Sequence, residues 1–258
     1  VWSVMSMEFR LFFASVSNLP IWQVPTTLVA QVDSAIGGKT GINLPAGKNL
    51  VGAFWQPRGV IADIATLATL PEREFVSGLA EVVKYGMILD AQFFGWLEAN
   101  AAAILRREPA ALEHVVARSA ALKAGVVERD EMERVGLRVV LNYGHTFAHA
   151  LETAAGYGTL LHGEAVAIGM AAAADLAARM GLIGAGIPAR QDALLTTLGL
   201  PVRTGSFPLP PAEHLIEIMA RDKKTLHGRL RFVLPRRIGH GELVDGVEPL
   251  LVQQVLDR

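Results

Sequence analysis

The feature that most constrains the fold of this 258-residue chain is a change of sequence pattern near residue 70. Before that point, short apolar and β-branched runs alternate with a glycine-rich stretch, which is typical of strands and loops. From Pro71 onward, apolar residues recur at helical spacing, and Pro71 followed by Glu72 and Glu74 suits the first turn of a helix. The sequence therefore predicts an α/β region followed by an all-α region.

The same patterns predict the individual elements. We expect a buried strand plus turn at 21–32, a loop at 33–49 and a short strand at 59–63. Helices are expected to begin at Pro71 and to occupy 101–128, 138–155, 162–181, 189–198 and 211–221, followed by a hairpin strand at 229–235 and a closing helix from 247 to 257.

Composition excludes several classes of site and partner. The chain has no cysteine, so any metal must be held by histidines and carboxylates, and disulfides are ruled out. The longest apolar run, Ala165 to Ala174, is too short to cross a bilayer. A net charge of −1 does not favour a nucleic-acid or membrane-surface binder, although local lysines and arginines could hold an anionic small molecule. We therefore expect a cytoplasmic protein.

Two charged motifs each admit a functional and a structural interpretation. Residues 37–49 (GGKTGINLPAGKN) combine Lys39 and Lys48 with glycines, which let backbone amides approach an anion closely. This segment either binds a phosphate or nucleotide, without the spacing of a P-loop, or is a flexible loop with solvated lysines. Glu81 and Lys84 lie three residues apart on one helix face and form either part of a site or a surface ion pair.

Histidines supply the candidate metal ligands. His145 and His149 lie four residues apart in LNYGHTFAHALE (141–152), a spacing that presents two imidazoles to one metal but also suits capping or core histidines. His162 opens the next helix and becomes a candidate third ligand if a carboxylate and another histidine lie nearby. An open site of two histidines and one carboxylate suits a catalytic zinc.

Taken together, these segments resemble the 3-dehydroquinate synthases, which are sugar-phosphate cyclases. The resemblance runs from about Pro20 to the C-terminus and implies that residues 1–70 are a remnant of a Rossmann-like, NAD-binding α/β domain. It implies that residues 71–258 form a helical metal- and substrate-binding domain and that the protein is a homodimer. The motifs are QVPTTLVAQVDSAIGGKTGINLPAGKNLVGAFWQP (23–57), TLATLPEREFVSGLAEVVKYG (66–86), the stretch 123–142, NYGHTFAHALE (142–152), GYGTLLHGEAVAIGM (156–170) and MARDKKTLHGRLRFVLPRRIG (219–239).

The resemblance also implies the residues of an active site. A divalent metal, zinc or cobalt, is expected on Glu81, His145 and His162, which moves it away from the pair His145 and His149. The residues implied in substrate contacts are Asp33, Lys39, Asn49, Lys84, Lys123, Glu133, Arg138, Asn142, His149 and one of Lys223 and Lys224. The residues implied in NAD contacts are Thr26, Thr27, Lys39, Lys48, Thr66, Leu67, Ala68 and Thr69.

The implied reaction converts the seven-carbon sugar phosphate DAHP to 3-dehydroquinate and phosphate in the shikimate pathway. NAD would transiently oxidise a ring alcohol, phosphate would leave by β-elimination, and re-reduction and an intramolecular aldol closure would follow. Lys84, three residues from a metal ligand, is expected to contact the carbonyl or enolate oxygen.

Residues 1–19 depart from the family pattern. They contain no glycine, whereas the family carries a segment resembling GGGVIGDLAGF just before the matching region, and a pyrophosphate cradle depends on glycine or a helix N-terminus. We therefore expect a truncated or frame-shifted form of a longer enzyme. The alternatives are another sugar-phosphate cyclase, such as a 2-deoxy-scyllo-inosose synthase, and an inactive metal-binding fragment that lacks the NAD loop.

Overall fold

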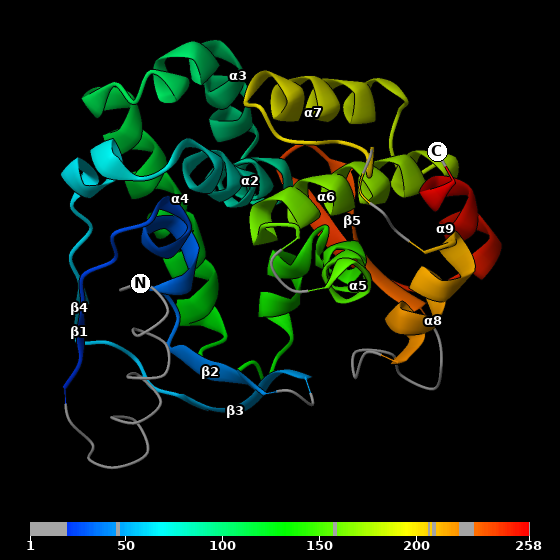
Figure 1. Cartoon of the computed structure of the whole chain (residues 1–258), viewed down its shortest axis with the longest axis horizontal. Helices are drawn as coiled ribbons and strands as arrows, with labels where there is room; N and C mark the ends of the chain where they lie inside the picture. Colours follow the sequence, from blue (N-terminus) through cyan, green and yellow to red (C-terminus); the bar gives the residue numbers. More distant parts are fainter. Residues whose placement is uncertain are drawn as a thin grey trace.

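The structure is a computed structural model that describes residues 20–257, apart from 45–46, 157–158, 206, 208–209 and 222–229. Residues 40, 42–44 and 47–53 are described by their backbone alone. The chain is partly α/β and mostly helical, which agrees in outline with the predicted class (Figure 1). Its first elements are β1 (Trp22–Gln23), the π-helical turn η1 (Ala30–Ser34), β2 (Lys39–Leu44), β3 (Gly47–Phe54), β4 (Gly59–Val60) and the 3-10 helix η2 (Ile64–Thr69).

The strands of this first region form two small sheets. β1 pairs in parallel with β4, and β2 pairs with β3 as an antiparallel hairpin. Within the strand plus turn expected at 21–32, the strand is only two residues long, because the chain turns into η1 where the Thr27 carbonyl accepts the amides of Ala30 and Gln31. The prediction of a loop at 33–49 was wrong, because much of this segment belongs to β2 and β3. Glycine content suggested a loop, but Gly41 and Gly52 lie opposite each other within a ladder that satisfies the backbone groups of both strands.

The second region consists of helices and one hairpin. Its elements are α2 (Glu72–Leu89), α3 (Ala91–Leu105), α4 (Pro109–Arg129), the 3-10 helix η3 (Leu137–Asn142), α5 (His145–Ala155), α6 (His162–Arg179), α7 (Gly186–Thr197), α8 (Ala212–Arg221), β5 (Leu230–Arg237), β6 (His240–Val247) and α9 (Pro249–Leu256). The helices expected from 162, 189 and 211, the strand at 229–235 and the closing helix were correct to within a few residues.

Two expected helices are each divided. The helix expected at 101–128 is α3 and α4, separated where Arg107 adopts a φ of 56° and Glu108 precedes Pro109 in extended conformation. The helix expected at 138–155 is η3 followed by α5, because Gly144 adopts a left-handed φ of 77° that glycine alone takes without cost. The second break places His145 at the very start of α5.

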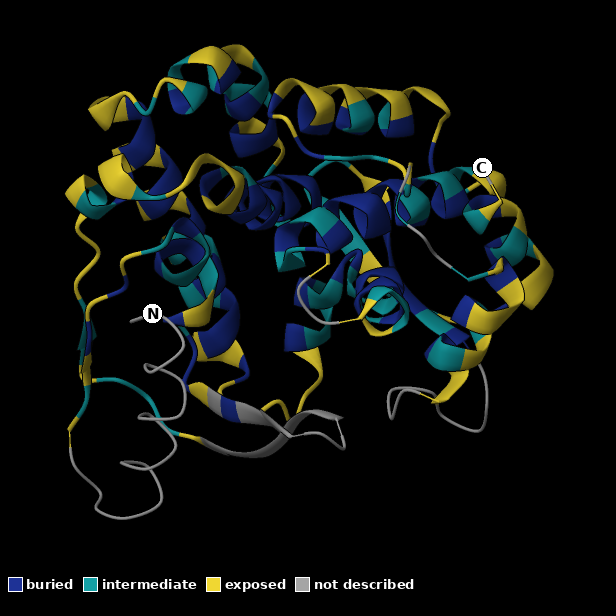
Figure 2. Ribbon diagram, in the orientation of Figure 1, coloured by how far each residue is buried: buried dark blue, intermediate teal, exposed yellow. Residues whose placement is uncertain are grey.

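The hydrophobic core surrounds α2, which passes through the middle of the molecule and packs against α3, α6 and the β5–β6 hairpin (Figures 1 and 2). Almost every residue of α2 from Phe75 to Ile88 is buried, including the polar Glu81 and Lys84. A surface helix would bury only one stripe. Polar groups inside such a core require partners, so Glu81 and Lys84 indicate a functional site on α2. Within the described residues, no helix is both long and apolar enough to span a bilayer.

Candidate active site

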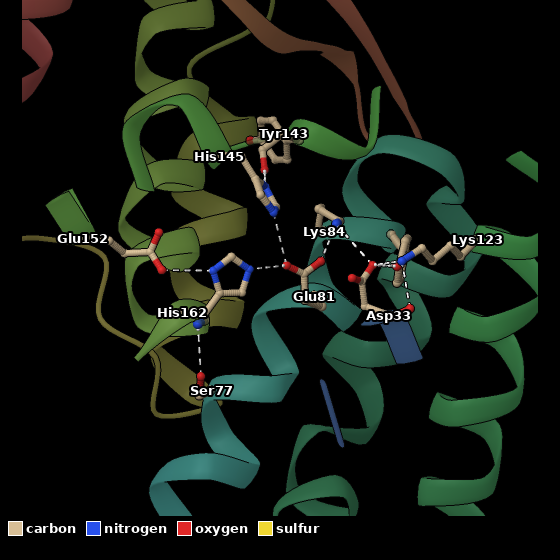
Figure 3. Close-up of polar contacts among 11 residues, drawn as sticks. Asp33, Ser77, Glu81, Lys84, Lys123, Tyr143, His145, Glu152 and His162 are labelled. Atoms are coloured by element: carbon tan, nitrogen blue, oxygen red, sulfur yellow. Dashed lines mark hydrogen bonds and ion pairs between the residues drawn. The ribbon is translucent and has the colours of Figure 1, made fainter. Parts of the chain in front are cut away.

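Three side chains from three helices converge beside the core. Glu81 comes from the middle of α2, His145 is the first residue of α5, and His162 is the first residue of α6 (Figure 3). Glu81 Oε1 lies 3.5 Å from His145 Nε2 and 3.3 Å from His162 Nε2. One ligand atom from each residue lies within 4.8 Å of the others, so the trio could hold a metal ion. These are the ligands implied by the resemblance.

The spacing of these atoms suits a zinc-sized ion. Ligand atoms about 2.0–2.2 Å from a tetrahedral metal lie about 3.3–3.6 Å from one another. The separations from Glu81 to the two imidazoles, 3.5 and 3.3 Å, fall in that range. Two histidines and one carboxylate also form the donor set of a catalytic zinc with one position left for a substrate. The residues present therefore fit a divalent metal.

The far side of each imidazole is occupied, which directs Nε2 toward Glu81. His145 donates from Nδ1 to the Tyr143 carbonyl at 3.0 Å. His162 Nδ1 lies 3.3 Å from Glu152 Oε1. A ring whose Nδ1 carries the proton presents the Nε2 lone pair, and partners of this kind orient metal-binding histidines.

The electrostatics of the trio favour a charged Glu81 and a neutral His145. Burial opposes the charge on Glu81, but the Lys84 ammonium and the two nearby imidazoles outweigh it, and its pKa is well below the usual range. Burial lowers the pKa of His145 to about 4, despite the nearby Glu81. Burial also opposes the charge on His162, but hydrogen bonds to Glu152 and Glu81 outweigh it and raise its pKa to about 9.

A second polar cluster adjoins the first through Lys84. The Lys84 ammonium contacts Glu81 and lies 3.9 Å from Asp33 Oδ1. Lys123, from α4, lies 2.8 Å from the same oxygen and donates to the Asp33 carbonyl at 2.8 Å. The Tyr85 hydroxyl also donates to this carboxylate. Two cations and one phenol therefore surround Asp33, and Glu81 lies between this cluster and the imidazoles (Figure 3).

Burial and charge oppose each other in this cluster as well. Burial opposes the negative charge of Asp33, but Lys123 and Lys84 outweigh it, so its pKa is below the ordinary value. For Lys123 burial prevails over the attraction of Asp33, and its pKa is lowered. Burial, followed by the Asp33 carboxylate, raises the pKa of Tyr85 well above its usual value, so the phenol remains a hydrogen-bond donor.

Three further predicted substrate residues line a cavity of about 220 Å³ between η3 and the β5–β6 hairpin. Arg138 is buried and donates to the carbonyls of Glu131 and Gly37, at 2.9 and 3.2 Å. Lys39, at the start of β2, makes an ion pair with Glu133. The cavity is lined by Glu133, Gly136, Arg138, Val139, Asn142, Thr146, Arg231, Val233 and Leu243.

The segments implied in NAD contacts are joined by the buried side chain of Gln31. Its amide donates to the Pro25 carbonyl at 3.2 Å, to the Asp63 carbonyl at 2.9 Å and to Thr66 Oγ1 at 3.1 Å. Thr26 and Thr27 follow Pro25, and Thr69 ends the same 3-10 helix as Thr66. Arg107 fixes that helix by donating to the carbonyls of Leu67 and Ala68, at 2.7 and 3.2 Å.

Other predicted residues are placed less fully. His149 does not join the trio and presents its ring edge-on to His145, with centroids 5.7 Å apart. Lys48 and Asn49 lie in β3, where only the backbone is described. Lys223 and Lys224 lie outside the described residues.

Sequence reasoning missed four contributors: Gln31, Tyr85, the Tyr143 carbonyl and the partner role of Glu152. Glu152 was visible one turn after His149, but only the fold brings it to His162. Tyr85 follows Lys84 directly, and the all-round apolar character of α2 signals that polar residues there are buried and need partners. A main-chain carbonyl such as that of Tyr143 leaves no signal in a sequence.

Comparison with known families matches most of the chain. Models described as 3-dehydroquinate synthase N-terminal and 3-dehydroquinate synthase C-terminal match residues 11–77 and 78–225. A 3-dehydroquinate synthase of Rhodopirellula baltica is 52% identical over 225 residues, which are 87% of this chain and 59% of the relative. One of Paracoccus denitrificans is 55% identical over 237 residues, 91% of this chain and 64% of the relative. The chain thus spans roughly three-fifths of the length of these relatives.

Solved structures agree in fold. A 2-epi-5-epi-valiolone synthase from Streptomyces hygroscopicus subsp. jinggangensis, with NAD+ and Zn2+ bound, superposes with a TM-score of 0.84 at 32% identity, over 92% of this chain and 65% of that one. A 2-deoxy-scyllo-inosose synthase complexed with carbaglucose-6-phosphate, NAD+ and Co2+ gives a TM-score of 0.77 at 28% identity, over 92% and 66% of the two chains.

Proposed function

The chain belongs to the 3-dehydroquinate synthase family, and from this premise we propose that it converts DAHP to 3-dehydroquinate and phosphate. The reaction comprises transient oxidation of a ring alcohol, elimination of phosphate, re-reduction and an intramolecular aldol closure. The observation that carries the proposal is the convergence of Glu81, His145 and His162 beside the buried Lys84. A metal held by these three residues would lie next to a buried cation that can stabilise a developing oxyanion.

The proposal includes a divalent metal and NAD. Glu81, His145 and His162 would hold zinc or cobalt, and the relatives of similar fold carry Zn2+ or Co2+ together with NAD+. When bound, NAD supplies reversible oxidation of an alcohol, and the metal supplies a Lewis acid for neighbouring hydroxyls. The residues that would hold NAD are Thr26, Thr27, Lys39, Lys48, Thr66, Leu67, Ala68 and Thr69. The Gln31 amide donates to Thr66 Oγ1 and to the carbonyl of Pro25, which directly precedes Thr26 and Thr27.

The remaining residues bind and orient an anionic sugar phosphate. Lys84 lies between the carboxylates of Glu81 and Asp33, so its ammonium can donate to a substrate oxygen close to the metal. Asp33 can accept a hydrogen bond from a ring hydroxyl, because Lys123 and Lys84 hold it charged. Lys39, Lys123, Glu133, Arg138 and Asn142 would contact the ring hydroxyls, the carboxylate or the phosphate. Asn49, His149 and one of Lys223 and Lys224 would contact the phosphate.

The choice of substrate rests on the closeness of the relatives. The curated 3-dehydroquinate synthases are 52% and 55% identical to the chain, whereas the 2-deoxy-scyllo-inosose synthase of similar fold is 28% identical. This difference favours DAHP over the substrates of other cyclases.

The proposal extends to the setting of the enzyme. We place the remnant of a Rossmann-like NAD-binding domain at 1–70 and the helical metal- and substrate-binding domain at 71–258, and we expect a cytoplasmic homodimer. The support is the division of the two family matches at residues 77 and 78, close to the proposed boundary.

The experiment that tests the function is phosphate release from DAHP by the purified chain. Release is expected to require both NAD and zinc or cobalt, and chelation or omission of NAD should abolish it. The variant His162→Ala tests the metal site in the same assay. Failure of a folded, metal-loaded chain to release phosphate would contradict the proposed activity and would favour a metal-binding fragment without catalysis.

A further inference from the structure

One carboxylate beside the proposed metal site takes no part in the proposed reaction. Glu152 lies on α5, two turns beyond His145, and is almost completely buried. Its Oε1 lies 3.3 Å from His162 Nδ1, on the side of the ring opposite Glu81. Glu152 is therefore not among the three residues that could hold the metal, but it contacts one of them directly (Figure 3).

The two histidines of the site are held in different ways. His145 is nearly enclosed, with 12% of its side chain exposed, and its Nδ1 donates to the main-chain carbonyl of Tyr143. His162 stands at the first position of α6 with 40% of its side chain exposed, so its ring is enclosed much less than that of His145. Within the described part of the chain, Glu152 is the group recorded at the Nδ1 side of this ring.

We propose that Glu152 is a positioning residue that holds the His162 ring with Nε2 directed at the metal. The buried carboxylate accepts the Nδ1 proton, which selects one tautomer and one ring orientation. Loss of such a partner typically weakens metal binding about 10–100-fold. The inference rests on the proposed metal site, but it concerns retention of the metal rather than turnover.

The test is the rate at which zinc-loaded protein releases Zn2+ into excess chelator. The release rate is measured instead of the equilibrium affinity for zinc. Removing Glu152 also changes the proton affinity of His162 in the metal-free protein, and protons compete with zinc for this residue when zinc binds. We expect Glu152→Ala to release zinc about 10–100-fold faster than the parent protein. Glu152→Gln keeps an acceptor oxygen of the same reach and should lie between the parent protein and Glu152→Ala.

Two controls make the outcome specific. Thr153→Ala changes an exposed neighbour on the same helix and should leave the release rate unchanged. His162→Ala removes the proposed ligand itself and should release zinc at least as fast as Glu152→Ala. Circular dichroism of each variant establishes that the helices remain, and Glu152→Gln serves if the alanine variant does not fold.

The possible failures are distinguishable. A parent protein that retains no zinc would overturn the proposed metal site and this inference together. If the parent retains zinc and both Glu152 variants release it at the parent's rate, the positioning role is wrong while the metal site stands. If Thr153→Ala speeds release as much as Glu152→Ala, the effect belongs to α5 as a whole, and the specific role is overturned.

Discussion

The α-carbon of Gly163 packs directly against the backbone carbonyl of Ser77, so closely that no side chain could be accommodated there. The Gly163 amide also donates to the Ser77 hydroxyl at 3.0 Å. Ser77 lies one turn before Glu81 on α2, and Gly163 directly follows His162 on α6. The contact between the two helices therefore determines how far the Glu81 carboxylate lies from the His162 imidazole.

Gly163→Ala is expected to damage both stability and metal binding. The new methyl group collides with main-chain atoms, which cannot swing aside, so α6 must move away from α2. Overpacking of this kind costs about 1–3 kcal/mol in the free energy of unfolding. Unfolding in urea and retention of Zn2+ measure the two effects. The matched control is Gly125→Ala in α4, where nothing lies near the added methyl group, and it should be stabilising by about 0.5–1 kcal/mol. Equal effects of the two substitutions would contradict this account.

Lys84→Met should strongly destabilise the metal-free protein. The side chains of Lys84 and Glu81 are 2% and 1% exposed, so the substitution leaves a buried carboxylate without its nearest cation. Breaking a buried ion pair costs about 3–5 kcal/mol. Added Zn2+ should reduce the difference in unfolding free energy between the parent protein and the variant, because the metal would compensate the charge of Glu81. Urea unfolding with and without zinc measures both quantities.

The control for this change is an exposed ion pair. Arg190→Met removes the partner of Glu98 at the surface and should cost about 0–1 kcal/mol. A cost for Lys84→Met as small as that of Arg190→Met would show that the buried pair contributes little.

Most helices could be predicted from the sequence because their apolar residues recur at helical spacing and their ends carry clear signals. α6 follows this pattern from His162, as do α7 and α8. The division between α3 and α4 was missed although Pro109 marked it, because the alanine-rich sequence on both sides favours helix equally well. The β2–β3 hairpin was missed because its glycine and proline residues are typical of a loop, whereas the pairing that defines it is a backbone ladder.

Residue spacing and family resemblance differed in which residues of the site they could predict. The spacing of His145 and His149 pointed equally to a metal pair and to core histidines, and the fold brings His145 to His162 instead. Periodicity could not find this, because it describes residues within one helix, whereas His145 and His162 begin two different helices. The resemblance supplied Glu81 and His162 because it carries the three-dimensional arrangement of relatives. Groups that support the ligands, such as Glu152, emerge only from the folded structure.

Gln31→Leu should loosen the two segments proposed to contact NAD. The leucine has a similar volume but cannot donate to the carbonyls of Pro25 and Asp63 or to Thr66 Oγ1. Leaving buried acceptors without donors costs about 1–3 kcal/mol. Urea unfolding should reveal that loss, and calorimetric titration should show weaker NAD binding, by about tenfold for each 1.4 kcal/mol lost from binding. Gln253→Leu, which removes one exposed hydrogen bond to Glu213, should change neither. If the Gln31→Leu protein is less stable but binds NAD as tightly as the parent protein, the hydrogen bonds of Gln31 stabilise the fold without contributing to NAD binding.

Asp90 should stabilise the protein in a pH-dependent way. Its carboxylate caps α3 by accepting the amides of Gln92 and Phe93, at 2.9 and 3.0 Å, and it pairs with Arg118. Burial opposes its charge, but the Phe93 amide and Arg118 outweigh burial and lower its pKa. Asp90→Ala should therefore cost about 0.5–2 kcal/mol at neutral pH, the usual contribution of an N-cap.

The sign of the pH dependence follows from the direction of that shift. A carboxyl with a lowered pKa in the folded protein contributes its full stability above the unfolded value of about 3.9, and loses it as the pH falls through the lower folded value. The difference in unfolding free energy between the parent protein and Asp90→Ala should thus stay constant from about pH 7 to pH 5 and shrink below about pH 4. Urea unfolding across this range measures it, with Asp175→Ala as the control for a carboxylate whose helix-surface pair with Arg179 contributes only about 0.3–0.5 kcal/mol. A difference that grows on acidification would mean that the protonated form of Asp90 is the better cap, which neither the two amide donors nor Arg118 allows.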